Sequence, residues 1–291
     1  MSPLARLSRL DSRRKFMSSN ALACSGEYAL ATGAAAVRRL HVLHNVYSPV
    51  GRRVLLQAGL AKGMKVADFG CGVGVVSRML AEMVGPSGSV TGVDINGAQL
   101  EQARHWCENA GLANTAFVEA SAYNTGLERG AFDLAYCRFL LLHLTDPAAC
   151  LREMHDILKP GGILVVEDGD LTAAGSIPHT ALNAFADLFG RLGPVRGLDY
   201  TLGTNLYHLV TSAGFCDAGL EIHQPAIRQG ENRYLLKWSV EEAAPALIDA
   251  GLITPAQLQR TLVEMQEATD NPGVVALMPR MSLVWARKAK N

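Results

Sequence analysis

The chain has 291 residues, of which 49% are apolar, so one large domain or two modest ones can bury a sizeable core. Its 27 basic residues balance its 27 acidic ones, which leaves no cationic surplus for gripping nucleic-acid phosphates. No run approaches the roughly 18 apolar residues that a spanning helix needs. The six cysteines form no C-x-x-C pair, which disfavours a zinc site. We therefore expect neither a nucleic-acid partner nor a membrane span nor a bound metal.

The N-terminal sixty residues divide into a leader and a helical part. Residues 1–20 are basic and read as a flexible leader. The run SRRKFM within them resembles a twin-arginine export signal, but Glu27 and several polar residues interrupt the stretch that follows. We therefore expect a cytoplasmic protein. Residues 21–60 carry two helical patterns, expected to cover a functional site.

From residue 61 the pattern changes to strands alternating with helices. Strands are expected near residues 64–69, 89–94, 115–119, 132–137 and 163–167, with helices near 75–84, 98–110 and 147–158 and a turn at 159–162. Such alternation requires right-handed crossovers and gives a parallel sheet covered on both faces. The strands are rich in Val, Leu and Ile without polar alternation, as doubly covered strands are.

The C-terminal third departs from this rhythm. Helices are expected at 180–192 and 203–213, and a strand follows at about 220–227, which would complete a core of residues 61–230. Residues 231–272 form a helical insertion, and residues 273–291 hold the final strand, 274–286, and a tail. The insertion lies between the last two strands, where it would roof the cleft or form a surface for a homodimer.

The most informative stretch is VADFGCGVG, residues 66–74, in which a strand runs into glycines and then a helix. Ligands bind at such a position, at the carboxyl end of a parallel strand. The dinucleotide pattern G-x-G-x-x-G would need glycine at Val75, whereas the third glycine here comes one place earlier. Asp68 also stands just before the loop, where an acid suits a cationic ligand better than a pyrophosphate.

This stretch resembles the first motif of class I S-adenosylmethionine-dependent methyltransferases. Further segments resemble later motifs of that family in order: VTGVD at 90–94, FVEASA at 117–122, FDLAYCR at 132–138 and LKPGG at 158–162. The chain is most similar to small-molecule methyltransferases of the ubiquinone- and menaquinone-biosynthesis type. The resemblance implies an α/β fold: a Rossmann-like, doubly wound, seven-stranded sheet, mostly parallel with an antiparallel last strand, with helical additions at both ends.

The resemblance also implies which residues hold the methyl donor. Asp94 would bind both ribose hydroxyls, since the two oxygens of a carboxylate each accept a hydrogen bond. Ser121 stands where the family usually has an acid near the adenine. Arg138 ends the fourth strand and would pair with the methionine carboxylate, with an acidic substrate, or in a buried ion pair. The implied donor-binding residues are Asp68, Gly70, Cys71, Gly72, Asp94, Ile95, Gln99, Ser121, Ala122, Cys137 and Arg138.

For the acceptor the sequence offers weaker candidates. His143 follows the fourth strand and is the leading general base, with a packed or capping histidine as the alternative. Glu167, Asp168 and Asp170 are expected to leave the fifth strand toward the same edge, either to orient the acceptor or as an exposed acidic loop. Tyr28 and Arg39, in the N-terminal helices, would form a lid. His41 and His44 share a helical face but lack a third metal ligand.

We therefore expect transfer of a methyl group from S-adenosylmethionine to O, N or C of a small molecule, with release of S-adenosylhomocysteine. Two alternatives remain open on the residues: a catalytically silent donor-binding regulator, and a nicotinamide-dependent oxidoreductase. A nucleic-acid methyltransferase is disfavoured by the balanced charge and by the lack of an Asn/Asp-Pro-Pro-Tyr-type motif after the fourth strand.

Overall fold

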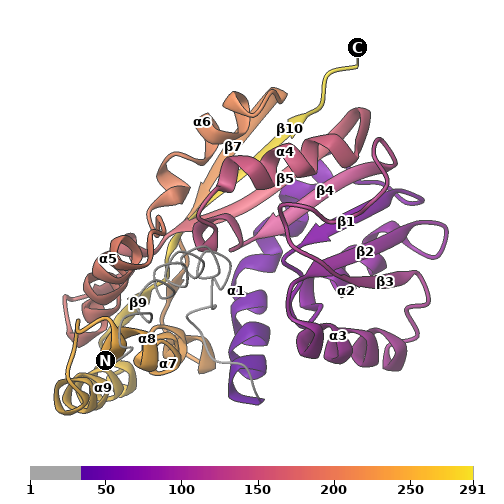
Figure 1. The fold of residues 1–291 in the computed structure, drawn as a ribbon. Coiled ribbons are helices and arrows are strands. Elements are labelled where there is room, and N and C mark those ends of the chain that lie inside the picture. Colours follow the sequence, from indigo (N-terminus) through magenta and orange to yellow (C-terminus); the bar gives the residue numbers. More distant parts are fainter. Residues whose placement is uncertain (1–33, 291) are drawn as a thin grey trace, which may run out of the picture.

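The computed structural model describes residues 34–290, and side chains from Val37 onward (Figure 1). A seven-stranded sheet forms its centre, in the order β3-β2-β1-β4-β5-β10-β7. The strands of this sheet are β1 (Lys65–Phe69), β2 (Ser89–Asp94), β3 (Thr115–Glu119), β4 (Phe132–Arg138), β5 (Leu158–Asp170), β7 (Cys216–His223) and β10 (Arg280–Arg287). The first five strands in that order run parallel, and β10 runs antiparallel to both β5 and β7. The predicted mostly parallel sheet with an antiparallel last strand is therefore confirmed.

Some helices cover the sheet, and others form a group at one end of the molecule. They are α1 (Ala34–Ala58), α2 (Val75–Val84), α3 (Gly97–Asn109), α4 (Pro147–Ile157), α5 (Ala184–Arg196), α6 (Leu206–Ser212), α7 (Leu235–Glu242), α8 (Ala244–Asp249) and α9 (Pro255–Asp270). In Figure 1, α5 and α7–α9 form a group at lower left, and α1 lies between this group and α2 and α3. Among the described residues, no helix is long and apolar enough to cross a membrane.

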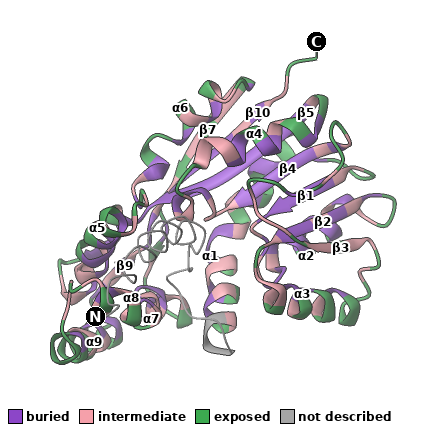
Figure 2. Ribbon diagram, in the orientation of Figure 1, coloured by how far each residue is buried: buried purple, intermediate pink, exposed green. Residues whose placement is uncertain are grey.

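The central strands are buried on both faces, as their composition predicted. Residues 66–69 of β1 and 134–137 of β4 are all buried, and Figure 2 shows the buried residues concentrated along these strands. Helix α2 packs on them through Val76, Met79 and Leu80. A parallel strand covered on both faces does not alternate polar and apolar side chains. Its continuous apolar run is therefore visible in the sequence, and the expected bounds of these strands were accurate.

Helix α1 differs from the prediction. Two helical patterns were expected in residues 21–60, and one continuous helix runs from Ala34 to Ala58. The helix continues through Pro49 without interruption. Proline usually ends or kinks a helix, since it lacks an N–H and its ring crowds the preceding turn. Tertiary packing offsets that cost here: Tyr47 and Val54, on either side of the proline, are almost fully buried.

The expected strands at 220–227 and 274–286 are each broken in two. Pro225 separates β7 from β8 (Ala226–Ile227), and Pro279 separates β9 (Val275–Leu277) from β10. Proline cannot donate to a ladder, so each strand leaves the main sheet there. The released pieces pair with β6 (Gly175–Ile177) as a small three-stranded sheet, β6-β9-β8, that the sequence did not predict.

Strand β5 is longer than expected in both directions. It already pairs with β4 at Leu158, so residues 159–162 lie within the strand's span as an irregular stretch, not in a separate turn. At the other end it continues to Asp170, because β10 supplies ladder partners for Gly169 and Asp170. The alternative in which Glu167, Asp168 and Asp170 form an exposed acidic loop was therefore wrong: all three lie in the strand and are buried.

Candidate functional site

The glycine loop after β1 carries the site's backbone geometry. Gly70, Gly72 and Gly74 have φ angles of 65°, 53° and 76°, in the left-handed region that side chains rarely adopt. A Cβ on Gly70 would lie 2.7 Å from Cδ1 of Leu140. The loop therefore requires glycine for its conformation and also for close approach of the segment that follows β4.

Asp94, at the carboxyl end of β2, joins this loop to the next one. One carboxylate oxygen accepts a hydrogen bond from the Gly72 N–H at 2.8 Å, and the other accepts from the Asn96 N–H at 3.0 Å. Burial raises the pKa of Asp94, while these backbone N–H groups oppose the rise. Each oxygen still has a lone pair for a further donor, so the carboxylate can also accept two hydroxyl groups.

A cavity of about 630 Å³ opens beside Asp94, which we call the donor cavity. It brings together eight of the residues singled out in the sequence: Gly70, Cys71, Gly72, Asp94, Ile95, Gln99, Arg138 and His143. Asn96, Phe139 and Leu140 also line it, and no sequence pattern singled them out. Leu40 and Leu43 of α1 close one side, and both belong to an apolar helical stripe that could be read in the sequence.

Asp68 lies beneath the loop and does not line the donor cavity. Its carboxylate accepts a hydrogen bond from the Ser77 hydroxyl of α2 at 2.5 Å, and its side chain is buried. Burial raises its pKa to about 7, against the opposing effects of Ser77 and Arg138. Asp68 therefore ties the strand to the helix on either side of the loop, and its contact with the donor stays a prediction.

Three other residues predicted to bind the methyl donor are not among the described residues that line the donor cavity. Ser121 accepts from the N–H of Tyr123 at 3.2 Å in the turn after β3, and Ala122 is partly buried against the core. Cys137 is completely buried in β4. Tyr28 lies outside the described residues. These four stay predictions.

Arg138 is held at the floor of the donor cavity by helix α1. It donates a hydrogen bond to Nδ1 of His44 at 3.1 Å, and burial, then the Arg138 charge, lowers the pKa of His44 to about 3. The histidine is therefore neutral and able to accept. The second terminal nitrogen of Arg138 is buried with no acceptor among the described residues. Arg138 also lines the cavity, and a guanidinium charge there suits a carboxylate or phosphate ligand.

The acids of β5 support the site from behind. Asp168 accepts hydrogen bonds from the N–H groups of Gly169 at 2.9 Å and Leu142 at 3.3 Å, so it fixes the segment that follows β4. Glu167 packs against Gly51 of α1, where a Cβ would lie 2.6 Å from Oε1. Burial raises the pKa of both Glu167 and Asp168 to about 7. Neither side chain lines the donor cavity.

A second, smaller chamber of about 60 Å³ adjoins the donor cavity, and we call it the inner chamber. Leu43, Phe139 and His143 line both spaces and so form the wall between them. The rest of its lining is mostly apolar and comes from distant parts of the chain: Arg39, Leu142, Leu171, Phe185, Phe189, Ser239 and Pro279. Residues from α1, α5 and α7 therefore meet around one small space behind the donor cavity.

His143 is half-buried at this wall and contacts the Tyr200 ring edge-on, with centroids 5.7 Å apart. Burial, then the charges of Arg39 and Arg196, lowers its pKa to about 3. The neutral imidazole can accept a hydrogen bond. The two guanidinium charges disfavour the imidazolium that full proton removal from an acceptor would create.

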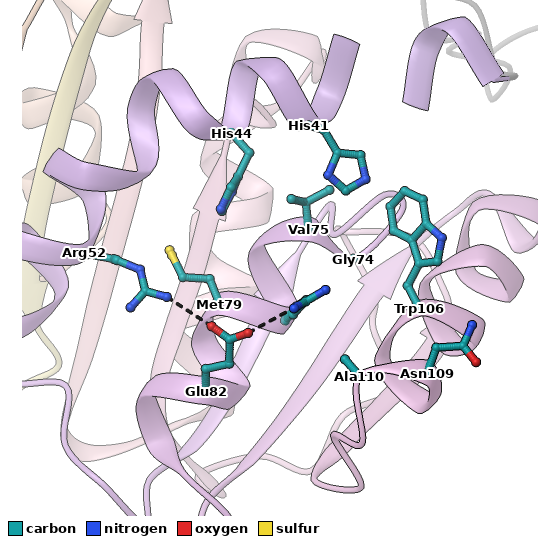
Figure 3. A pocket seen from close by; sticks show the side chains of 11 residues that line it. His41, His44, Arg52, Gly74, Val75, Met79, Glu82, Trp106, Asn109 and Ala110 are labelled. Atoms are coloured by element: carbon teal, nitrogen blue, oxygen red, sulfur yellow. Dashed lines mark hydrogen bonds and ion pairs between the residues drawn. The ribbon is translucent and has the colours of Figure 1, made fainter. Parts of the chain in front are cut away.

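No group of three or more His, Cys, Asp or Glu side chains suited to a metal ion occurs in residues 34–290. His41 and His44 instead line a further cavity on the other side of α1 (Figure 3).

Comparison with known proteins identifies the class. The model of a family described as a methyltransferase domain matches residues 60–211, more than half of the 291-residue chain. This chain belongs to that methyltransferase-domain family, and the predicted class I, S-adenosylmethionine-dependent type is confirmed at the level of the family. The demethylmenaquinone methyltransferase of Staphylococcus aureus is 35% identical over 114 residues, 39% of this chain. The match covers 46% of that relative, so the chain spans about half of its length.

Solved structures confirm the fold. A methyltransferase from Aquifex aeolicus described as SAM-dependent has a TM-score of 0.50 at 20% identity, covering 69% of this chain and 95% of its own. The phosphoethanolamine N-methyltransferase 2 of Haemonchus contortus, solved with S-adenosyl-L-methionine, has a TM-score of 0.51 at 15% identity, covering 87% and 52%. The [4+2]-cyclase SpnF has a TM-score of 0.51 at 22% identity, covering 84% and 81%. A cyclase among these structures shows that the fold alone does not decide the reaction.

Proposed function

We propose that this protein transfers the methyl group of S-adenosylmethionine to a small-molecule acceptor. The observation that carries the proposal is the pairing of two spaces: a donor cavity bounded by the glycine loop and Asp94, and an inner chamber directly behind it. Their shared wall consists of Leu43, Phe139 and His143. A donor and an acceptor in these spaces would meet there.

The residues of the donor cavity fit the donor group by group. The two spare lone pairs of Asp94 match a pair of ribose hydroxyls, and Gln99 stands beside them. The positive charge of Arg138, which lines the cavity, matches the methionine carboxylate. The glycines let the chain of the donor pass close to the loop backbone. When bound, S-adenosylmethionine supplies an electrophilic methyl group on a sulfonium.

The chain's own contribution to the reaction is placement and exclusion of water. Holding two reactants in line can lower a barrier by about 7 kcal/mol or more. Phe139 and Leu43 give the wall an apolar surface that would exclude water. We propose that neutral His143 accepts a hydrogen bond from the acceptor and does not remove its proton completely. Asp168 holds the segment that carries Phe139 and His143, so its role is positioning.

Three finer expectations belong to the same proposal. We propose a cytoplasmic protein, because the proposed donor is a cytosolic metabolite. The balanced charge favours a small acceptor over nucleic acid. If helices α7–α9 do not roof the cleft, we propose that they pair two copies as a homodimer.

Turnover with tritium-labelled donor across a panel of phenols, quinols, amines and carboxylic acids tests the activity. We expect label in at least one product and its loss in Asp94→Ala, with His143→Gln keeping donor binding while acceptor turnover falls. A chain that binds the donor but labels no acceptor would instead be a silent donor-binding protein. A chain that oxidises or reduces substrates with a nicotinamide would overturn the proposal.

A further inference from the structure

A third cavity, of about 560 Å³, lies on the opposite side of α1 from the inner chamber, in a groove between α1, α2 and α3 (Figure 3). We call it the groove cavity. It is nearly as large as the donor cavity and shares with it one lining residue, Val75. Nothing in the proposed methyl transfer uses it.

The groove cavity has a surplus of positive charge. Arg52 of α1 and Arg78 of α2 both pair with the same carboxylate, Glu82, at 3.2 and 3.1 Å (Figure 3). No other acid lines the cavity in the part of the chain that the structure describes. Two guanidiniums therefore share one carboxylate, and each keeps N–H donors for a further oxygen. All three side chains are about half exposed, so their mutual attraction is weak and a ligand can compete for the arginines.

The other walls of the groove cavity are aromatic and apolar. Trp106 of α3 contacts His41 of α1, with ring centroids 4.4 Å apart, and the partly exposed Val75 adds an apolar surface beside them (Figure 3). Burial lowers the pKa of His41 and that of His44, so both rings are neutral near pH 7 and add no charge. A flat apolar ring fits beside the indole, because stacking on it buries one face of the ring together with indole surface.

We propose that the groove cavity binds a planar aromatic carboxylate, with its ring against Trp106 and Val75 and its carboxylate on Arg52 and Arg78. Guanidinium pairs bind carboxylates with two parallel N–H···O bonds, which gives both affinity and orientation. The proposal goes beyond the methyl transfer and does not depend on it, since the site has its own charge and its own walls.

The test is calorimetric titration of the full chain with 1-naphthoate, and with neutral 1-naphthamide as the matched ligand. Naphthoate is expected to bind and naphthamide to bind at least roughly tenfold more weakly, since the charged contact is lost. Arg52→Ala and Arg78→Ala are each expected to weaken naphthoate roughly tenfold. Glu82→Gln is expected to tighten it roughly threefold, because the arginines lose their competing acid.

Two control variants make the same kinds of charge change at positions outside the groove cavity. Arg260→Ala on α9 and Glu101→Gln on α3 alter exposed residues outside the groove cavity and are expected to leave naphthoate binding unchanged. Saturating S-adenosylhomocysteine separates this cavity from the donor cavity: binding that survives it supports the proposal. Binding that it abolishes, equal affinity for the amide, or unchanged affinity in both arginine variants would each overturn it. A chain that binds naphthoate but ignores S-adenosylhomocysteine keeps this inference and loses the proposed function.

Discussion

Helix α1 is fastened to the helical insertion by one buried ion pair, and breaking it is the most informative stability experiment. Arg39 donates from Nε to Glu242 of α7 at 2.8 Å, and the two side chains are 4% and 9% exposed. Burial raises the pKa of Glu242, and the Arg39 charge opposes the rise. In Arg39→Met the carboxyl group would stay buried without its cation.

The cost follows from that burial. Removing one partner of a buried pair costs about 3–5 kcal/mol, and the slight exposure of Glu242 places this case near about 3 kcal/mol. Replacing both partners, in Arg39→Met with Glu242→Leu, leaves no buried charge and should recover most of the loss. Without Arg39 the pKa of Glu242 rises further, so the deficit should be largest at pH 8 and shrink at pH 5, because protonation removes the buried negative charge.

Urea unfolding of the wild type, both single variants and the double variant at pH 8 and pH 5 measures all of this in one double-mutant cycle. The same set assayed for acceptor turnover shows whether fastening α1 matters for the inner chamber, which Arg39 lines. A loss below about 1 kcal/mol in Arg39→Met, or a double variant no more stable than the worse single one, would refute the reasoning.

Three further predictions follow from single contacts. Alanine usually stabilises a helix relative to glycine, but Gly51→Ala should destabilise by about 1–3 kcal/mol in urea unfolding, because its Cβ would meet the Glu167 carboxylate, and adding Glu167→Ala should restore stability. Tyr47→Phe should cost about 1–2 kcal/mol by thermal unfolding, since the buried hydroxyl donates to the Pro279 carbonyl at 2.8 Å. The imidazole of His143, with its pKa lowered to about 3, should stay neutral from pH 8 to pH 5; a proton NMR titration midpoint near pH 6.5, assigned with His143→Gln, would contradict this.

Much of the fold could be predicted because strand composition and glycine position are local signals. The strands β1 to β4 and the helices between them lie within one or two residues of their expected bounds. The errors fell where long-range pairing decides. Strand β5 extends to Asp170 because β10, 110 residues later, pairs with it, and the small sheet forms from pieces too short to show a period.

The site was predicted unevenly for the same reason. Gly70, Gly72 and Asp94 follow from a motif whose backbone geometry the residues themselves require. The inner chamber joins α1, α5 and α7, and no local pattern reports which side chains of such distant segments meet. Phe139 is an example, because its side chain lines both spaces and its φ angle is 50°. An aromatic residue after a strand does not by itself indicate such a backbone conformation or such a position.

If the glycine loop and Asp94 bind the adenosyl group of the methyl donor, calorimetric titration of the full chain with S-adenosylhomocysteine, which carries the same adenosyl group, tests this most directly. Two hydroxyl contacts to a carboxylate are worth about 3 kcal/mol, so Asp94→Ala should weaken binding roughly a hundredfold while NADH gives no heat with either protein. Equal affinity in the variant and the wild type, or tighter binding of NADH than of S-adenosylhomocysteine, would contradict the account.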